Sequence, residues 1–150
     1  MMDYINWIRS KVGHEKIILT FVVGVIENGK GQILMQRRGD SNLWGLTGGA
    51  MELSEKPEDT LRREIFEETS IEKFSVRDFQ GVYTTLEQHY PNGDVAQCID
   101  LVYQVVVSEN VDLSFNNEET LELKWVGQNE IPPLFNPTHM EIIEDYFKKA

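Results

Sequence analysis

Hydrophobic and polar residues recur along the chain with two different periods, and the period predicts where helices and strands lie. Residues Asp3 to Lys11 carry several apolar side chains and end before Gly13, which predicts a short amino-terminal helix. The apolar run Ile17 to Ile26 predicts a buried strand, because it is too short to span a bilayer. Asn28-Gly29 then predicts a hairpin turn into a second strand over Gln32 to Arg37.

A glycine-rich stretch follows, and the pattern then returns to regular elements. Pro57 to Thr69 predicts a helix, because proline suits the first helical position and acidic residues favour the positive end of the helix dipole. The remaining segments are three predicted strands and a closing amphipathic helix: Phe74 to Tyr90, broken near Gly81, Gln97 to Val107, Leu121 to Val126, and His139 to Lys149. This mixture lacks a regular βαβ alternation and predicts an α+β fold or mixed-sheet sandwich, as one domain over residues 1–150 with a helical extension over 1–13.

The charge balance narrows the classes of partner. The chain has 150 residues and a formal net charge of -11. Phosphate backbones and anionic membranes both attract basic surfaces, so a nucleic-acid polymer and a membrane are not expected as partners. An acidic protein still binds small phosphate compounds when divalent cations lie between the two sets of negative charge.

Cysteine and histidine usage adds little chemistry. Cys98 is the only cysteine, so no internal disulfide forms, and with no signal-peptide pattern at the start the expected compartment is the cytoplasm. Cys98 lies in an apolar stretch and is expected to be a packed thiol. His14, His89 and His139 lack the spacing of metal ligands and are expected at the surface.

Three carboxylates on the predicted Pro57–Thr69 helix form the most informative pattern. At about 100° per residue, Glu64, Glu67 and Glu68 fall within roughly one 100° arc of the helix. Like charges at these spacings repel one another unless a cation joins them, and hard oxygen ligands suit magnesium or manganese. Arg63 is one turn from Glu67 and is placed to hold a carboxylate, while the preceding glycines let the backbone approach a metal or phosphate closely.

The segment over residues 49–71 resembles the Nudix box of the MutT-like hydrolases. That box is a glycine, a glutamate after a short spacer, and a later Arg-Glu-apolar-x-Glu-Glu-x-Gly-apolar run. The positions that match in register are Gly49, Glu55, Arg63, Glu64, Ile65, Glu67, Glu68 and Ile71. From average residue usage, such a match arises by chance on the order of once in 10⁶ chains, so an incidental acidic helix is disfavoured.

Three positions depart from the family pattern. Thr47, Ser54 and Ser70 stand where the family has a proline and two glycines. Ser70 is expected to end the helix in a left-handed conformation, at a cost of ~1 kcal/mol. None of these changes removes a carboxylate, so they bear on loop geometry more than on metal binding.

The resemblance implies an αβα sandwich around a central mixed sheet, with the box as a loop–helix–loop catalytic motif. It implies that water attacks phosphorus in a nucleoside diphosphate linked to another moiety, such as a nucleoside triphosphate, modified nucleotide or nucleotide sugar. The implied cofactor is Mg²⁺, for which Mn²⁺ can substitute. The implied metal ligands are Glu64, Glu67, Glu68 and the carbonyl of Gly49, with Glu55 either ligating metal or pairing with Arg63.

The general base is left open between two regions. Family members carry it either on the box, where Glu64 is the candidate, or on a later loop. The later candidates here are Glu118, Glu119 and Glu122, and we favour Glu119 because it stands at a predicted loop-to-strand junction.

Substrate contacts are expected from two further regions. Arg37 and Arg38 end the second predicted strand, where alternation sends them to opposite faces, so at most one is expected to meet a phosphate; analogy favours Arg38. The segment Tyr83 to Asp94 is expected to line the pocket through Tyr83 and Tyr90, because aromatic side chains stack on bases. The competing interpretation places Tyr83 in the core and Tyr90 beside a surface turn.

Two other functions compete with hydrolysis. The first is a catalytically silent Nudix-like domain that senses a nucleotide, and the second is a structural protein with an incidental box. The full carboxylate set disfavours the sensor, which has no need to keep all three glutamates together. The sequence does not choose the substrate, and it leaves a homodimer open.

Overall fold

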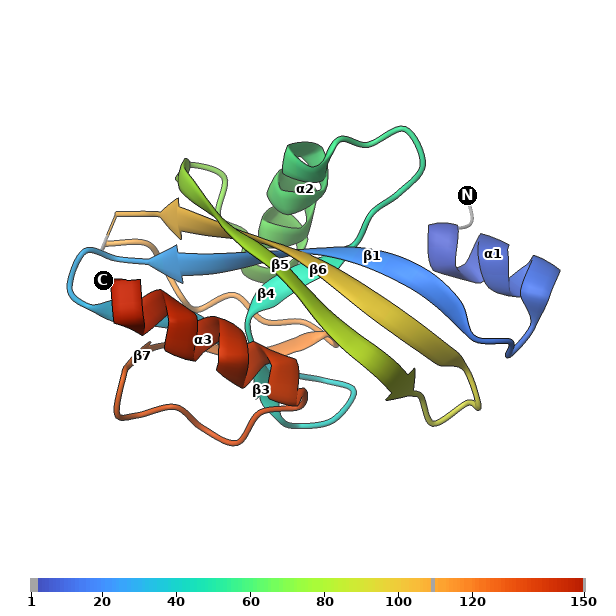
Figure 1. Cartoon of the computed structure of the whole chain (residues 1–150). Coiled ribbons are helices and arrows are strands. Elements are labelled where there is room, and N and C mark those ends of the chain that lie inside the picture. The colour runs from blue at the N-terminus through green and yellow to red at the C-terminus, as the bar shows by residue number, and fades with distance from the viewer. Residues whose placement is uncertain (1–2, 109, 150) are drawn as a thin grey trace.

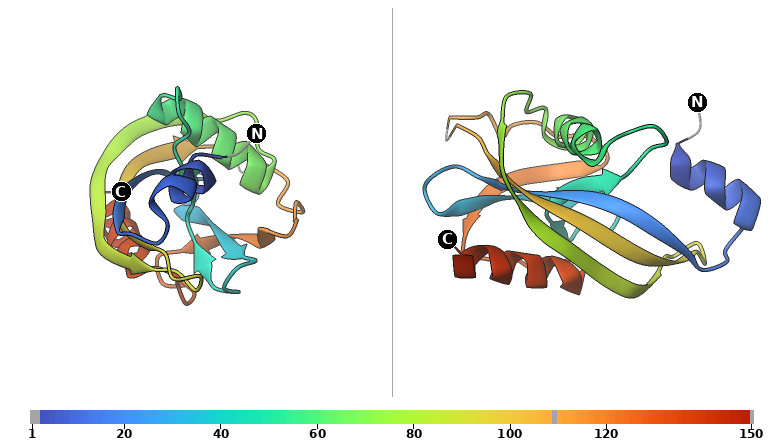
Figure 2. Two further views of the ribbon diagram at one scale, coloured as in Figure 1. Left: turned by 90° about the vertical axis from the view of Figure 1, so that its right-hand side faces the viewer. Right: turned by 45° about the horizontal axis from the view of Figure 1, so that its top comes forward.

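The computed structural model describes residues 3–108 and 110–149 and shows helices on both faces of a mixed sheet (Figure 1). The elements in chain order are α1 (Tyr4–Val12), β1 (Ile17–Glu27), β2 (Gln32–Arg38), β3 (Trp44–Gly45), β4 (Thr47–Ala50), α2 (Pro57–Thr69), β5 (Ser75–His89), β6 (Val95–Val106), β7 (Thr120–Gly127) and α3 (Pro137–Lys149). Helix α2 lies on one side of the curled sheet and α3 on the other (Figure 2). This arrangement confirms the predicted αβα sandwich.

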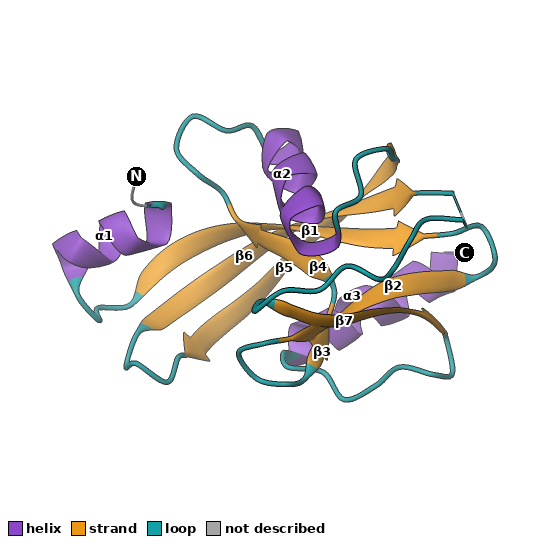
Figure 3. Ribbon diagram, turned by 180° about the vertical axis from the view of Figure 1, so that it is seen from behind, coloured by secondary structure: helices purple, strands orange, loops and turns teal. Residues whose placement is uncertain are grey.

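Strand β1 organises the sheet. It pairs in parallel with β6 along its whole length, from Ile17 opposite Ala96 to Glu27 opposite Val106. On its other side it pairs antiparallel with β4 and, at its end, with β2. The strand order is β3-β2-β1-β6-β5, with β7 beside β2, as the view from behind shows (Figure 3). The single parallel pairing among antiparallel ones makes the sheet mixed.

Alternation along the strands separates the core into clusters on the two faces. On the α2 face, Leu61 and Ile65 pack on Val22 and its neighbours. On the α3 face, a second cluster joins Ile142 of α3 to Val102 of β6 and to its neighbours. A third cluster, formed by Leu19, Ala96 and Cys98, lies with Tyr4, Ile5 and Ile8 of α1, so the prediction of a packed Cys98 thiol is confirmed.

The predicted elements are largely confirmed, and the differences have physical causes. The α2 bounds agree with the prediction, and α1 is the predicted amino-terminal helix, although residues 1 and 2 of that extension lie outside the described residues. The predicted break near Gly81 is wrong, since β5 runs through it with a register shift between Phe79 and Gly81. The short strands β3 and β4 were not predicted, because a glycine-rich segment shows no alternation.

The end of α2 places a serine in a strained backbone conformation. Ser70 has φ 65° and ψ 10°, and its N–H donates to the carbonyl of Phe66. Ser54, in the loop before the helix, has φ 71°. Both serines occupy positions where the family has glycine, and the predicted left-handed Ser70 is confirmed. Residues other than glycine adopt this conformation at a cost, because Cβ approaches the carbonyl oxygen.

We predict that Ser70→Gly raises the free energy of unfolding by about 0.5–1 kcal/mol, because glycine removes the Cβ strain. Urea denaturation of the full chain measures the change. Ser10→Gly, inside α1, is the matched control, since glycine in a helix interior lowers stability by a similar amount. A less stable Ser70→Gly protein would contradict the assignment of strain to this cap.

Candidate active site

Strand β4 brings two glycines against the middle of α2. The N–H of Gly48 donates to Oε1 of Glu68 over 2.8 Å. A Cβ on Gly49 would lie 2.2 Å from the carboxyl carbon of Glu64, and one on Gly48 would lie 2.3 Å from the carbonyl oxygen of Val22. A side chain at Gly48 has no room, and one at Gly49 would displace the Glu64 carboxylate, so the backbone of β4 lies close to the box at both positions.

Arg63 is the hydrogen-bond centre of the box. Its Nε donates to Oε2 of Glu55 over 2.7 Å, and its Nη1 donates to Oε1 of Glu64 over 2.7 Å. Nη2 donates to the carbonyl of Ala50 over 3.1 Å, and Nη1 lies 3.4 Å from Oε2 of Glu67. One guanidinium therefore ties the loop before α2 to the carboxylates on the helix, which a lysine ammonium does not do with the same planar fork.

Glu55 is held as the charged partner of Arg63. Its carboxylate also accepts the backbone N–H of Glu52 and the hydroxyl of Thr60. The hydrogen bond from Arg63 is the main reason that the pKa of Glu55 falls to about 2. The sequence leaves two roles open for Glu55, metal ligand or partner of Arg63. The observed contacts are those of a partner of Arg63.

The partly buried Glu64 and the buried Glu68 have pKa shifts opposite to that of Glu55. Burial raises the pKa of Glu64 above its usual range. Glu68 is 8% exposed, and burial, followed by the charge of Glu64, raises its pKa to about 8. Two carboxylates that disfavour each other's charge in a buried setting form a place where a divalent cation lowers the electrostatic energy.

Gln36, which the sequence pattern did not single out, lies beside the Glu64 and Glu68 carboxylates. Gln36 is 2% exposed, and its side chain lowers the pKa of Glu68 by hydrogen bonding. Its Nε2 also donates to Oγ1 of Thr120 over 2.6 Å, so it connects α2 to the start of β7. The available signal was a polar residue directly after the apolar run Ile33 to Met35.

The donor set fits a hard divalent cation. Carboxylate oxygens of Glu64, Glu67 and Glu68 are the ligands that Mg²⁺ and Mn²⁺ prefer. Within residues 3–108 and 110–149, no three acidic, histidine or cysteine side chains already converge on one point. Arg63 holds Glu64 and the Gly48 N–H holds Glu68 instead, so the fit rests on the chemistry and the burial of the donors.

A recess beside α2 brings the later loop to the box. It encloses about 460 Å³ and is lined by Glu67, Asn117, Glu118 and Glu119. The side-chain oxygen of Asn117 accepts the N–H groups of Glu119 and Thr120, which fixes the loop as an Asx turn. The charge of Glu119 also raises the pKa of Glu64, so the two carboxylates lie within electrostatic reach of each other.

The two arginines at the end of β2 have different surroundings. A β-bulge lies between them, so strict alternation does not hold there. Arg37 pairs with Glu122 over 3.3 Å. Arg38 pairs with Asp40 over 2.7 Å and lies 3.9 Å above the ring of Phe135. The charge of Arg38 lowers the pKa of Glu68, which places Arg38 within electrostatic reach of the box.

The tyrosines expected at the pocket lie elsewhere than at the carboxylates. Tyr83 is 8% exposed within the α3-side core, and its hydroxyl donates to Asp145 over 2.8 Å. This position agrees with the competing interpretation, in which Tyr83 belongs to the core. Tyr90 flanks the turn at residues 91–93, as the competing interpretation expects, and its N–H donates to the Asp94 carbonyl. Its side chain is partly buried, and the hydroxyl lies 3.8 Å from Sγ of Cys98 beneath α1.

The expectation of a surface His139 is wrong. His139 is 5% exposed, and its Nδ1 accepts the N–H of Leu46 over 3.0 Å. Its ring meets Phe135 edge to face at 4.8 Å. His139 lies near the start of α3, on the face of the helix that packs on the core. The spacing between histidines in the sequence does not reveal this position. His14 and His89 are exposed, as predicted.

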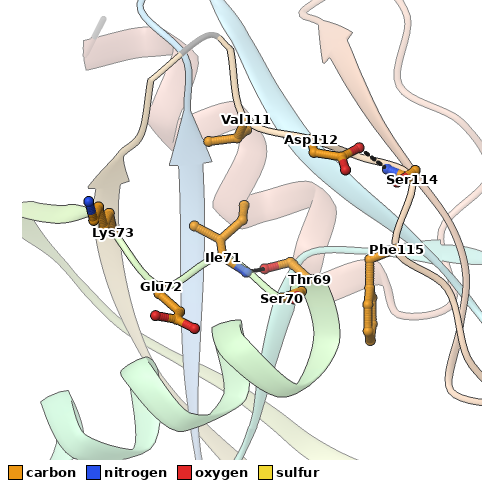
Figure 4. A pocket seen from close by; sticks show the side chains of 9 residues that line it. All are labelled: Thr69, Ser70, Ile71, Glu72, Lys73, Val111, Asp112, Ser114 and Phe115. Atoms are coloured by element: carbon orange, nitrogen blue, oxygen red, sulfur yellow. Dashed lines mark hydrogen bonds between the residues drawn. The ribbon is translucent and has the colours of Figure 1, made fainter.

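A larger hollow lies at the carboxyl end of α2 (Figure 4). It measures about 570 Å³ and is lined by Thr69, Ser70, Ile71, Glu72, Lys73, Val111, Asp112, Ser114 and Phe115. None of the box carboxylates lines it, whereas Glu67 lines the smaller recess. In the part of the chain that the structure describes, no helix has the length and apolar character to cross a membrane.

Comparison with known proteins agrees with this geometry. The family model described as "NUDIX domain" matches residues 19–146. The chain belongs to the Nudix (MutT-like) hydrolase family. Its Nudix domain thus begins after α1, and Glu55, Arg63 and the α2 carboxylates are its box.

Individual Nudix relatives show similar coverage. The chain is 34% identical to a MutT-like protein of Streptomyces ambofaciens, over 73% of this chain and 64% of that one. It is 32% identical to the nucleoside triphosphatase NudI of an Enterobacter strain, over 77% and 86%. The dihydroneopterin triphosphate pyrophosphohydrolase of E. coli has the same fold, with a TM-score of 0.72 at 19% identity, over 87% of this chain and 96% of that one.

We predict that His139 makes the protein sensitive to acid. Burial lowers its pKa from 6.5 to about 3, so the stability gained by keeping it neutral is complete above pH 6.5 and is lost as the pH falls from 6.5 towards 3. His139→Asn retains an acceptor for the Leu46 N–H and does not protonate. The variant should therefore lose less stability than the wild type between pH 6.5 and 4, by at most about 1.4 kcal/mol per pH unit.

Urea denaturation at a series of pH values measures this difference. His14→Asn is the matched control, since that ring is 68% exposed, and it should follow the wild-type slope. Parallel slopes for His139→Asn and the wild type would show that His139 does not limit acid stability.

Proposed function

We propose that this chain hydrolyses a phosphoanhydride bond of a small nucleoside diphosphate derivative with the help of Mg²⁺. The observation that carries the proposal is the Arg63 centre, which orders Glu55 and Glu64 while Glu68 lies buried against the Gly48 N–H. Buried like charges are costly to keep, and they are retained here beside a recess that carries a further carboxylate, Glu119.

Different residues would bind the cation and the phosphates. Glu64, Glu67 and Glu68, with the carbonyl of Gly49, would hold the cation. When bound, that cation neutralises charge on the phosphates and lowers the pKa of water. Arg38 would bind a phosphate oxygen, because its guanidinium already lies near Glu68 and presents a planar donor pair.

Glu119 would act as the general base. The oxygen of water attacks phosphorus, the bond from phosphorus to the bridging oxygen breaks, and the proton of the water passes to the Glu119 carboxylate. Glu119 lines the recess beside α2. Glu64 is the alternative base, but its carboxylate is occupied by Arg63 over 2.7 Å.

Nucleoside triphosphates are the first substrates to test. NudI of Enterobacter is named a nucleoside triphosphatase, and a Bacillus subtilis relative with 29% identity is named a putative 8-oxo-dGTP diphosphatase. Both names describe small nucleotides with a phosphoanhydride bond. The net charge of -11 supports a small ligand over a nucleic-acid polymer.

We predict that a panel of nucleoside triphosphates, modified nucleotides and nucleotide sugars contains compounds that the chain cleaves with Mg²⁺ or Mn²⁺. Product analysis shows which phosphorus–oxygen bond breaks, and excess chelator should abolish the reaction. Full turnover in excess chelator would refute metal dependence. Binding without turnover across the panel would favour the silent sensor instead.

We predict different defects at the helix and the later loop. Glu68→Gln should lower turnover at least ~10²-fold and also raise the Mg²⁺ concentration needed for half-maximal rate, because it removes a ligand charge. Glu119→Gln should lower turnover while leaving that Mg²⁺ concentration unchanged, because it removes the base. Steady-state kinetics at varied Mg²⁺ separates the two.

The matched control lies on the same helix. Glu58→Gln changes an exposed carboxylate in the first turn of α2 and should keep wild-type kinetics. If Glu119→Gln also keeps the wild-type rate, the base lies elsewhere, and Glu64 and Glu118 are next to test. If Glu68→Gln loses activity only by unfolding on calorimetry, its assigned role in metal binding is wrong.

A further inference from the structure

Asp100 is a buried carboxylate that the proposed reaction does not use. It lies in the middle of β6 and is 5% exposed. Its Cα partners are Phe21 in β1 and Tyr83 in β5. Across residues 3–108 and 110–149, no side chain or backbone group forms a hydrogen bond or ion pair with the Asp100 carboxylate. A carboxylate without such a partner is costly to bury, and burial accordingly raises the pKa of Asp100 to about 6.

The neighbours of Asp100 show that it lies between two apolar clusters. Along β6, Cys98 on one side belongs to the cluster beneath α1, and Val102 on the other side belongs to the cluster beneath α3. Alternate residues of a strand share a face, so Asp100 faces the same side as both. Figure 1 shows α1 and α3 towards opposite ends of the long strands. Along β6, Asp100 lies between a residue of the cluster beneath α1 and a residue of the cluster beneath α3.

The carboxylate remains accessible in spite of its burial. In the described part of the chain, the fully enclosed polar atoms without a partner are Nε of Arg9 and Oε1 of Gln36. The Asp100 oxygens are not among them although they lack partners, so they retain a path to solvent. An unpaired acceptor with a path to solvent is placed to receive donors from a ligand.

Strand pairing connects Asp100 to the box, because Phe21 of β1 pairs with Asp100 of β6 on one side and with Ala50 of β4 on the other. Burial raises the pKa of both Glu68 and Tyr90, and the charge of Arg38 opposes both rises. The Tyr90 hydroxyl lies 3.8 Å from Sγ of Cys98, two residues from Asp100 on the same face. Asp100 therefore lies two strands from Ala50, whose carbonyl accepts a hydrogen bond from Arg63, and one ligand with phosphates at the box can extend its other end towards Asp100.

A carboxylate selects among bases by accepting hydrogen bonds and donating none. Guanine presents two adjacent donors, N1–H and the exocyclic 2-amino group, which match the two carboxylate oxygens. Adenine and cytosine place a ring acceptor beside their amino group, and uracil and thymine flank one N–H with carbonyl oxygens, so each sets an acceptor against the carboxylate. Pterins carry the same pair of donors, a ring N–H beside a 2-amino group.

We propose that Asp100 determines base specificity by accepting hydrogen bonds from the ring N–H and the adjacent 2-amino group of a guanine or pterin substrate. The inference rests on the proposed function for the position of the phosphates. Asp100 is a specificity-determining residue in this account and takes no part in proton transfer.

Calorimetric titration of the full chain tests the proposal with GMP, IMP, AMP and neopterin in the presence of Mg²⁺. These compounds have no phosphoanhydride bond, so binding is read whether or not the chain hydrolyses a triphosphate. IMP lacks only the 2-amino group, and GMP should bind about 10- to 100-fold more tightly than IMP, with AMP weaker still, because one charge-assisted hydrogen bond is lost. Tighter binding of neopterin than of GMP would show that the preferred substrate carries a pterin.

Asp100→Asn should reduce GMP affinity about 10- to 100-fold and remove most of the preference over IMP. Its melting temperature should equal or exceed that of the wild type, because an unpaired buried charge is removed. Asp145→Asn, the same change in α3 beside Tyr83, should keep the wild-type preference. Affinities of wild type for GMP, IMP and AMP within threefold, or no detectable GMP binding at millimolar concentration, would overturn the proposal without any variant.

Discussion

The crowding of negative charge around one arginine is the constraint on which the site depends. Arg63 bonds Glu55 and Glu64 and reaches Glu67, while its remaining donor meets the Ala50 carbonyl. These contacts fix the loop against α2, so the loop, the helix and the carboxylates form one unit. The arrangement also explains why β4 needs glycine where it passes the helix, because any side chain at Gly49 would meet the Glu64 carboxylate.

Stability and function oppose each other along this surface. Glu68 and Asp100 are both buried carboxylates whose pKa burial raises, to about 8 and about 6 respectively. A chain selected only for stability would replace them with neutral groups. Their charges become favourable only when something cationic or hydrogen-donating arrives. In the proposed reaction Glu68 lies where metal and phosphates would bind, and in the proposal for Asp100 its carboxylate would bind a base.

Much of this was predictable because it depends on local sequence. Helical spacing placed the α2 carboxylates on one arc. The left-handed backbone of Ser70 was predictable because Ser70 stands at the end of the helix, where the family pattern has glycine. The residues that escaped prediction owe their roles to tertiary contacts. His139 is buried because its face of the helix contacts Leu46, which is distant in sequence. The role of Gln36 depends on its contacts with Glu68 and Thr120, which are also distant in sequence. Asp100 looked like one polar residue within an apolar strand, since sequence alone cannot show that it lacks a partner.

The central claim is that the Arg63-ordered carboxylates form a divalent-cation site, and direct metal binding tests it without reference to any substrate. Electron paramagnetic resonance of Mn²⁺ titrated into the full chain measures the affinity. The account predicts bound Mn²⁺ in the wild type, at least tenfold weaker binding in Glu68→Gln and in Arg63→Lys, and no change in Glu58→Gln. Equal Mn²⁺ affinity in all four proteins, or no bound Mn²⁺ in the wild type, would contradict it.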